Sequence, residues 1–242
     1  MNYLCSYWLS PDASEARVAE LKRYFDLQCY LKRRMGSQQI ILTNIDYPNA
    51  IPIDLPSNFT AEFAMFARFF GLAQVIKSGI SFPLCVHDHD FFNAKELVYD
   101  DGAILVAALV NDFFSDQVVV YPEISKQVIL DFVDSLWALD FEAFMQSGYG
   151  TEVRHEGLFS TEQTLVNLGL HPFEPIPIRR EFNIKDQVSF DIVDQHSLDS
   201  AHVKAEPIPA GIHGVHGHLN KGPATDVLLD WLALELLNRK HR

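Results

Sequence analysis

The triplet Asp88-His89-Asp90 is the part of the sequence whose residue types point most directly to chemistry. Two carboxylates separated by one residue on a tight turn can both face one hard cation such as Mn²⁺ or Mg²⁺. Such a cation can bridge a diphosphate and neutralise the charge that builds up on a leaving group. The alternative is a polar loop whose aspartates cap the next helix. The apolar run before the triplet and Phe91-Phe92 after it favour the metal site, in which His87 and His89 are ligands or hydrogen-bond partners of ligands.

A glycine-rich segment late in the chain carries three histidines, His213, His216 and His218. Its glycines allow the backbone to approach a ligand closely, and Lys221 can meet a phosphate. A neutral imidazole from this segment can complete a metal site built on carboxylates. Each histidine alone is compatible with an ordinary surface loop, but the cluster as a whole favours a function.

Residues 155–167 form a third polar group. If a helix starts near Thr161, Glu162 and Gln163 lie at its start, where polar side chains can bind sugar hydroxyls and the helix dipole suits an anion. Capping of that helix by Ser160 or Thr161 explains the same residues equally well. Both interpretations stay open.

Alternating strands and helices must position the triplet. The patterning predicts strands over residues 3–9, 39–45 and 82–86, with helices between them that end at Lys32-Arg33-Arg34 and span 60–77. Asp12 and Glu15 form a capping-box pattern before the first helix, and Gly79 is a left-handed cap after the second. Such alternation predicts a parallel sheet, in which ligands bind at the carboxyl ends of strands. The triplet is expected at one of those ends.

The rest of the chain is less regular. It predicts strands over 103–109 and 188–193 and helices over 125–146, 161–168 and 226–239. No stretch reads as a linker, so residues 1–242 are expected to form one α/β domain.

The charge and the cysteines restrict the partners and the compartment. The formal net charge of −13 argues against nucleic acid as a partner, whereas an anionic substrate bound through a divalent cation fits an acidic protein. The three cysteines lie far apart without paired spacing, which predicts reduced thiols and a cytoplasmic protein. No signal peptide or membrane-spanning run is expected, and peripheral contact with a membrane stays open.

The order of these motifs resembles that of GT-A type nucleotide-diphospho-sugar glycosyltransferases, particularly the glycogenin and lipopolysaccharide galactosyltransferase families. In those families an aromatic-rich helix with Ser-x-x-Arg-like residues leads into a strand and Asp-x-Asp, as Phe63-Ala-Met-Phe-Ala-Arg68 leads here into the triplet. The family segment Asp-Gln-Asp-x-x-Asn is similar to Glu162-Gln163-Thr-Leu-Val-Asn167. Its closing His-x-x-Gly-x-x-Lys-Pro-Trp is loosely similar to His216-Gly-His218-Leu-Asn-Lys221-Gly-Pro, which differs in His-to-Lys spacing and lacks Pro-Trp.

The resemblance implies a single Rossmann-like GT-A domain with a mostly parallel central sheet flanked by helices. Residues 1–90 would be its nucleotide-binding half and residues 91–242 its acceptor and sugar half. It further implies transfer of a sugar from a nucleotide-diphospho-sugar donor to an unidentified acceptor, which can be a glycan, a protein or a small molecule.

The resemblance also implies roles for individual residues. The Mn²⁺ or Mg²⁺ ligands would be Asp88, Asp90 and a tail histidine, with His213, His216 and His218 all candidates. Asp88, Arg68 and Lys221 would contact the donor, and Arg68 or Gln163 would orient its sugar. An inverting enzyme needs a carboxylate base, for which Glu156 and Glu162 are the candidates.

Two other functions fit the same residues. His87, His89 and Asp90 with the tail histidines can form the zinc site of a hydrolase. The chain can also be a carbohydrate-binding relative that has lost turnover. Binding of a nucleotide sugar with Mn²⁺ supports transfer, whereas tight zinc without nucleotide binding supports hydrolysis.

Overall fold

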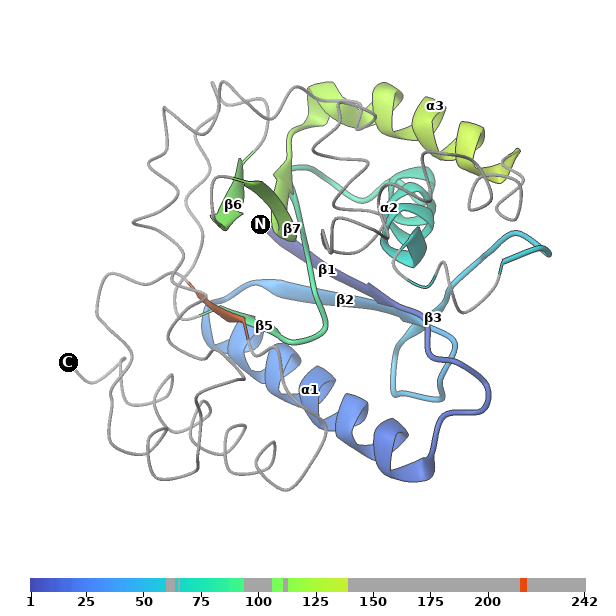
Figure 1. Cartoon of the computed structure of the whole chain (residues 1–242). Coiled ribbons are helices and arrows are strands. Elements are labelled where there is room, and N and C mark those ends of the chain that lie inside the picture. The colour runs from blue at the N-terminus through green and yellow to red at the C-terminus, as the bar shows by residue number, and fades with distance from the viewer. Residues whose placement is uncertain (60–63, 65, 94–105, 111–112, 139–213, 217–242) are drawn as a thin grey trace.

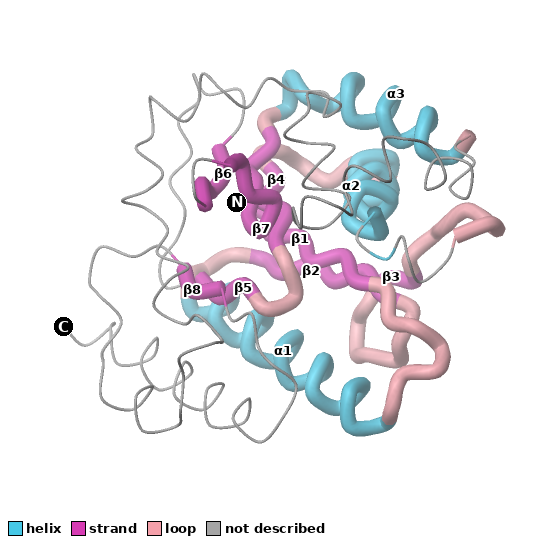
Figure 2. The backbone as a smooth tube through the Cα atoms, in the orientation of Figure 1, coloured by secondary structure: helices cyan, strands magenta, loops and turns pink. Residues whose placement is uncertain are grey.

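The computed structural model describes residues 1–59, 64, 66–93, 106–110, 113–138 and 214–216. In this part of the chain six strands form one sheet in the order β3-β2-β1-β4-β7-β6 (Figures 1 and 2). They are β1 (Asn2–Tyr7), β2 (Gln38–Thr43), β3 (Ile51–Pro52), β4 (Leu84–His87), β6 (Val106–Val110) and β7 (Phe113–Tyr121). The first four strands of that order run parallel, and β7 runs antiparallel to both of its neighbours. The predicted α/β fold with a mostly parallel sheet is confirmed.

Helices cover both faces of the sheet. The helix α1 (Glu15–Arg34) lies on one face, and α2 (Ala67–Lys77) and α3 (Lys126–Trp137) lie on the other (Figure 1). Side chains alternate between the faces of a strand, so β1 supplies both layers. Cys5 belongs to the hydrophobic cluster under α1, whereas Leu4 belongs to the cluster under α2 and α3.

The limits of α1 follow from local interactions. Its N-cap is Ser14, whose Oγ accepts a hydrogen bond of 3.2 Å from the backbone N–H of Arg17. The predicted capping box on Asp12 is therefore wrong, because Asp12 accepts a hydrogen bond from Ser10 and lies three residues before the first helical residue. The predicted end at the basic run is confirmed, since Arg34 is the last helical residue.

The helix α2 packs unusually close to β1. Ser6 donates a hydrogen bond of 2.8 Å from Oγ to the carbonyl oxygen of Ala67. Gly71, one turn further along, permits this approach, because a Cβ atom there would lie 2.2 Å from Ser6 Oγ. After α2, Gly79 has a φ of 86°, as its predicted left-handed cap requires.

Two short strands form a second sheet in the described part of the chain. They are β5 (Phe91–Asn93) and β8 (Gly214–His216), which pair antiparallel. Figure 2 shows them side by side next to the C-terminal half of α1. Neither strand was expected from the sequence, and β7 was not expected either.

Several other expectations concern residues only partly described. The helix α3 begins one residue after the predicted start at Ser125, and residues 139–146 lie outside the described part. The helix α2 ends at the predicted Lys77, while residues 60–63 and 65 are outside that part. The predicted elements at 161–168, 188–193 and 226–239 also lie outside it. In the described ranges no helix is long and apolar enough to cross a membrane.

Candidate functional site

The Asp88–Asp90 turn follows the carboxyl end of β4, where the strand order of the sheet changes direction. From β1 the chain adds β2 and β3 on one side and then returns to place β4 on the other. The strands β1 and β4 are parallel neighbours, with Tyr3 opposite Cys85. Open α/β sheets bind ligands at such a switch point, outside the carboxyl ends of the strands. The predicted position of the triplet at a strand end is confirmed.

The turn itself is tight, and hydrogen bonds from a side chain of α1 hold it in place. The backbone N–H of Phe91 donates a hydrogen bond of 3.2 Å to the carbonyl oxygen of Asp88. The side-chain amide of Gln28 donates to the carbonyl oxygens of Asp88 and His89, at 3.2 Å and 2.7 Å. The two carboxylates are mostly sheltered, with 17% of the Asp88 side chain and 12% of the Asp90 side chain exposed. The turn is therefore an ordered, partly desolvated pair of carboxylates.

Asp88 forms an ion pair with Arg68 of α2. The Arg68 side chain is only 8% exposed, so the pair is largely removed from water and less screened than a surface pair. In this arrangement Arg68 contacts the triplet directly, whereas the contact of both residues with a donor stays a prediction. A cation or a diphosphate at Asp88 would share that carboxylate with the guanidinium.

His89 is oriented by groups from β1 and α1. Its ring packs on Tyr7 at 4.2 Å between centroids, and its Nε2 lies 3.2 Å from Nη2 of Arg17. A guanidinium can only donate, so Nε2 accepts and Nδ1 carries the ring proton. That Nδ1 lies 3.8 Å from Oδ1 of Asp90. His89 Nε2 is thus occupied by Arg17, which leaves it unsuited to bind a metal in this arrangement.

His87 points into the core beside the triplet. It is 2% exposed, its Nδ1 lies 2.8 Å from the carbonyl oxygen of Asp88, and its Nε2 lies 3.1 Å from the side-chain amide of Gln39, so a ring with one N–H donates to only one of these two groups. Burial, reinforced by the nearby Lys32, lowers the pKa of His87 to about 3, so the ring is neutral. Both ring nitrogens contact protein oxygens, and in the described part of the chain no three His, Cys, Asp or Glu side chains form a group able to hold a metal ion. This arrangement gives no support to a zinc site built on His87 and His89.

The strand β8 brings the backbone of residues 214–216 beside the segment that follows the triplet. His216 lies opposite Phe91 in the β5–β8 ladder, and Phe91 directly follows Asp90. Opposite residues of an antiparallel pair have Cβ atoms about 5 Å apart. The backbone of His216 therefore lies beside that of Phe91, the residue after Asp90, although 125 positions separate the two residues in the sequence.

The remaining predicted site residues lie outside the described part of the chain. They are Glu156, Glu162, Gln163, His213, His218 and Lys221. The structure thus brings together Arg68, the triplet and the His216 backbone.

The side chains at the turn that could contact a hard divalent cation are the two carboxylates of Asp88 and Asp90. Two carboxylates on one tight turn provide oxygen ligands, and among the described residues no group of three His, Cys, Asp or Glu side chains forms around them. Arg17 and Arg68 add positive charge around the same turn. Both guanidiniums already face carboxylates of the chain, since Arg17 pairs with Glu20 and Arg68 pairs with Asp88.

Three residues at this site were not predicted from the sequence. Tyr7 ends the strand parallel to β4, so its position could have been inferred from the expected sheet. Arg17 and Gln28 are eleven residues apart on α1, which is about three helical turns and places them on one side of the helix. The available signal was an amide at helical spacing among apolar residues, since Gln28 follows the buried Leu21 and Phe25.

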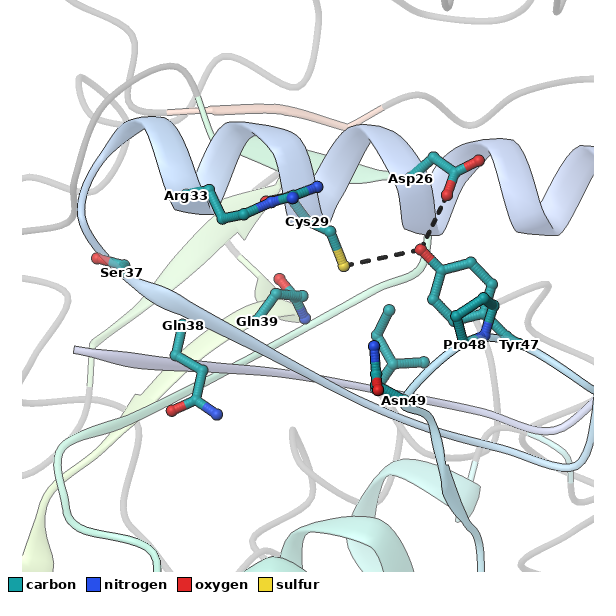
Figure 3. Close-up of a pocket in the computed structure, with 10 residues that line it drawn as sticks. Asp26, Cys29, Arg33, Ser37, Gln38, Gln39, Tyr47, Pro48 and Asn49 are labelled. Atoms are coloured by element: carbon teal, nitrogen blue, oxygen red, sulfur yellow. Dashed lines mark hydrogen bonds between the residues drawn. The ribbon is translucent and has the colours of Figure 1, made fainter.

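A pocket of about 510 Å³ lies between α1, β2 and the turn after β2 (Figure 3). Figure 3 shows Tyr47 reaching up to the helix, where its hydroxyl donates to Asp26 at 3.0 Å and contacts Cys29 Sγ at 3.8 Å. The triplet does not line this pocket. Gln39 lines the pocket and also contacts His87, the residue before the Asp88–Asp90 turn.

Comparisons with known proteins give structural neighbours. No protein-family model matches the chain, and no curated protein matches it. Among solved structures, the chain is similar to a glycosyltransferase involved in the glycosylation of the major capsid of PBCV-1, with 11% identity, a TM-score of 0.47 and coverage of 96% of this chain and 98% of the other. It is also similar to glycosyltransferase GlyE of Streptococcus pneumoniae TIGR4, in one structure at 13% identity and in the apo form at 12%. Both GlyE matches have a TM-score of 0.45 and cover 99% of this chain, which spans 62% of the GlyE chain.

Proposed function

We propose that this chain is a metal-dependent glycosyltransferase that moves a sugar from a nucleotide-diphospho-sugar donor to an acceptor. The observation that carries the proposal is the pairing of β8 with β5, which sets the backbone of His216 opposite the residue after Asp90. The backbone of a histidine-containing segment, far away in the sequence, thereby lies beside the segment that follows the Asp88–Asp90 turn at the switch point of the sheet. Mixed oxygen and nitrogen ligands suit Mn²⁺ and also accept Mg²⁺.

The proposed donor site uses charges from three elements. Asp88 and Asp90 would hold the cation, which when bound would neutralise the diphosphate leaving group. Arg17 of α1 and Arg68 of α2 would add positive charge beside it. During transfer the bond from the anomeric carbon to the phosphate oxygen breaks, the electron pair stays on the diphosphate, and the acceptor oxygen forms the new bond after losing its proton.

Residues outside the described ranges complete the proposal. Lys221 would contact the diphosphate, Gln163 would orient the sugar, and Glu156 or Glu162 would accept the proton in an inverting enzyme. His213 and His218 stay candidates for the metal beside His216. Residues 1–90 would then bind the nucleotide and 91–242 the sugar and acceptor, in a cytoplasmic protein.

A thermal-shift screen tests this function. Nucleotide sugars are added with and without Mn²⁺, and the melting temperature is measured for wild type, Asp90→Ala and Asp131→Ala. We expect a shift that requires both the nucleotide sugar and Mn²⁺, because a ligand at 100 times its Kd stabilises the native state by about 2.7 kcal/mol. Asp90→Ala should lose the shift. Asp131→Ala should keep it, since Asp131 is an exposed carboxylate on α3.

Two outcomes contradict the proposed function. One is that no nucleotide sugar stabilises the wild type in the presence of Mn²⁺. The other is that Asp90→Ala responds as strongly as Asp131→Ala.

A further inference from the structure

We propose that Gln28 is a positioning residue for the Asp88–Asp90 turn, because its side-chain amide holds the carbonyl groups that set the direction of both carboxylates. Gln28 lies in the middle of α1 and is fully buried. Its Nε2 lies 2.7 Å from the carbonyl oxygen of His89, 3.2 Å from that of Asp88 and 3.5 Å from that of Phe91. One amide thus spans the whole turn from the end of β4 to the start of β5.

The carbonyl oxygen of the Gln28 side chain lowers the stability of the fold in this arrangement. Gln28 Oε1 is buried and has no hydrogen-bond partner among the described residues. A buried acceptor without a partner costs about 1–3 kcal/mol, which an apolar side chain of similar size would avoid. The orientation of the amide is explained by its nitrogen, because a reversed amide would point an oxygen at three carbonyl oxygens.

A second buried polar residue of α1 holds the other end of the segment. Lys32, one turn after Gln28 and 1% exposed, donates from Nζ to Oδ1 of Asn93 and lies 3.9 Å from the ring centroid of Tyr3. Asn93 is the last residue of β5 and pairs with Gly214 of β8. Residues 88–93 are therefore held at both ends by the inner face of one helix.

This support determines how the proposed metal site is aimed. The peptide groups that Gln28 holds adjoin Asp88 and Asp90, so rotation of those peptides would turn the carboxylates. Residues that orient metal ligands through hydrogen bonds typically change metal affinity by about 10–100-fold when they are replaced. This last step rests on the proposed function, whereas the hold on the turn stands on the hydrogen bonds alone.

The test compares Gln28→Met with Gln127→Met. Met is close to Gln in size and removes the N–H donors, and Gln127 is an exposed glutamine of α3. Hydrogen–deuterium exchange of the backbone amides at 88–93 and the affinity for Mn²⁺ alone are measured on both variants and on wild type. We expect Gln28→Met to exchange at least about 10-fold faster in this segment and to bind Mn²⁺ about 10–100-fold more weakly. Gln127→Met should match the wild type in both measurements.

The outcomes separate this proposal from the proposed function. Unchanged exchange at 88–93 in Gln28→Met overturns the hold of Gln28 on the turn, and faster exchange with unchanged Mn²⁺ affinity overturns the role of that hold in directing the two carboxylates. If wild type binds no Mn²⁺, the metal-dependent function fails, while the exchange result still decides whether Gln28 holds the turn. If Gln28→Met does not fold, NMR of the wild type decides: the Gln28 side-chain amide protons should exchange slowly, and rapid exchange of them overturns the proposal.

Discussion

Arg68 near the start of α2 forms an ion pair with Asp88, the residue that follows β4. Removing one partner of such a buried pair leaves the other charge uncompensated and costs about 3 kcal/mol or more. We therefore expect Arg68→Met to lower the free energy of urea unfolding by about this amount. Added Mn²⁺ should then stabilise Arg68→Met more than wild type, because the cation can replace the guanidinium at Asp88.

A double variant isolates the pair. Arg68→Met with Asp88→Asn should recover part of the lost stability, since neither buried charge remains. If the losses of the two single variants simply add in the double variant, Arg68 and Asp88 are not coupled and this prediction is wrong.

The tautomer of His89 is the second prediction. Because Arg17 donates to Nε2, we expect the neutral ring to carry its proton on Nδ1. The ¹⁵N chemical shifts of the imidazole report this directly. In Arg17→Met, where the donor is gone, the Nε2–H form should rise. Equal tautomer populations in wild type and Arg17→Met would contradict the assignment.

The third prediction concerns acid stability through His87. Burial lowers the pKa of His87 to about 3 in the folded protein, whereas an unfolded histidine titrates near pH 6.5. Between these values the unfolded chain binds a proton that the native state does not, so stability falls as the pH is lowered from about 6.5 towards about 3. His87→Asn, which keeps a donor near the Asp88 carbonyl group and does not titrate, should show a shallower fall. Urea unfolding from pH 7 to 4 checks this, and parallel curves would refute it.

The fourth prediction tests the close packing of α2 on β1. In Gly71→Ala the new Cβ would lie 2.2 Å from Oγ and 2.6 Å from Cβ of Ser6, so the helix must shift. Overpacking of this kind typically costs about 1–3 kcal/mol, measurable by urea unfolding. Ser6→Gly removes both contacting atoms and should make the Gly71→Ala substitution less harmful. A neutral Gly71→Ala would show that α2 and β1 are less tightly packed.

The sequence predicted the elements that depend on local patterning. The periodicity of residues 1–90 indicates strand, helix, strand, helix and strand, and β1, α1, β2, α2 and β4 lie where it places them. Helix ends were predicted well where one residue decides them, as Gly79 does through its positive φ. The helix start was missed because Asp12 and Ser14 are both suitable caps, and the geometry of the chain selects Ser14.

The sequence pattern predicted less well those features that depend on neighbouring strands and helices. Along β7 three polar residues, Ser115-Asp116-Gln117, interrupt the apolar run, and the strand is supported by β4 at residues 118–121 and by β6 on its other side. Similarly, Lys32 reads as one of three cations at a helix end. The position of the helix over β1 and β5 instead buries its amine, and desolvation lowers its pKa to about 7.

The candidate site likewise has some features that local sequence determines and others that depend on tertiary packing. The sequence by itself determined that two carboxylates follow a buried strand, because strand ends and turn residues are local features. The tertiary structure decided that Arg68 pairs with Asp88, that Gln28 holds the turn, and that β8 lies beside β5. These contacts join residues between 20 and 125 positions apart in the chain, and such contacts arise from the packing of whole elements rather than from the preferences of single residues.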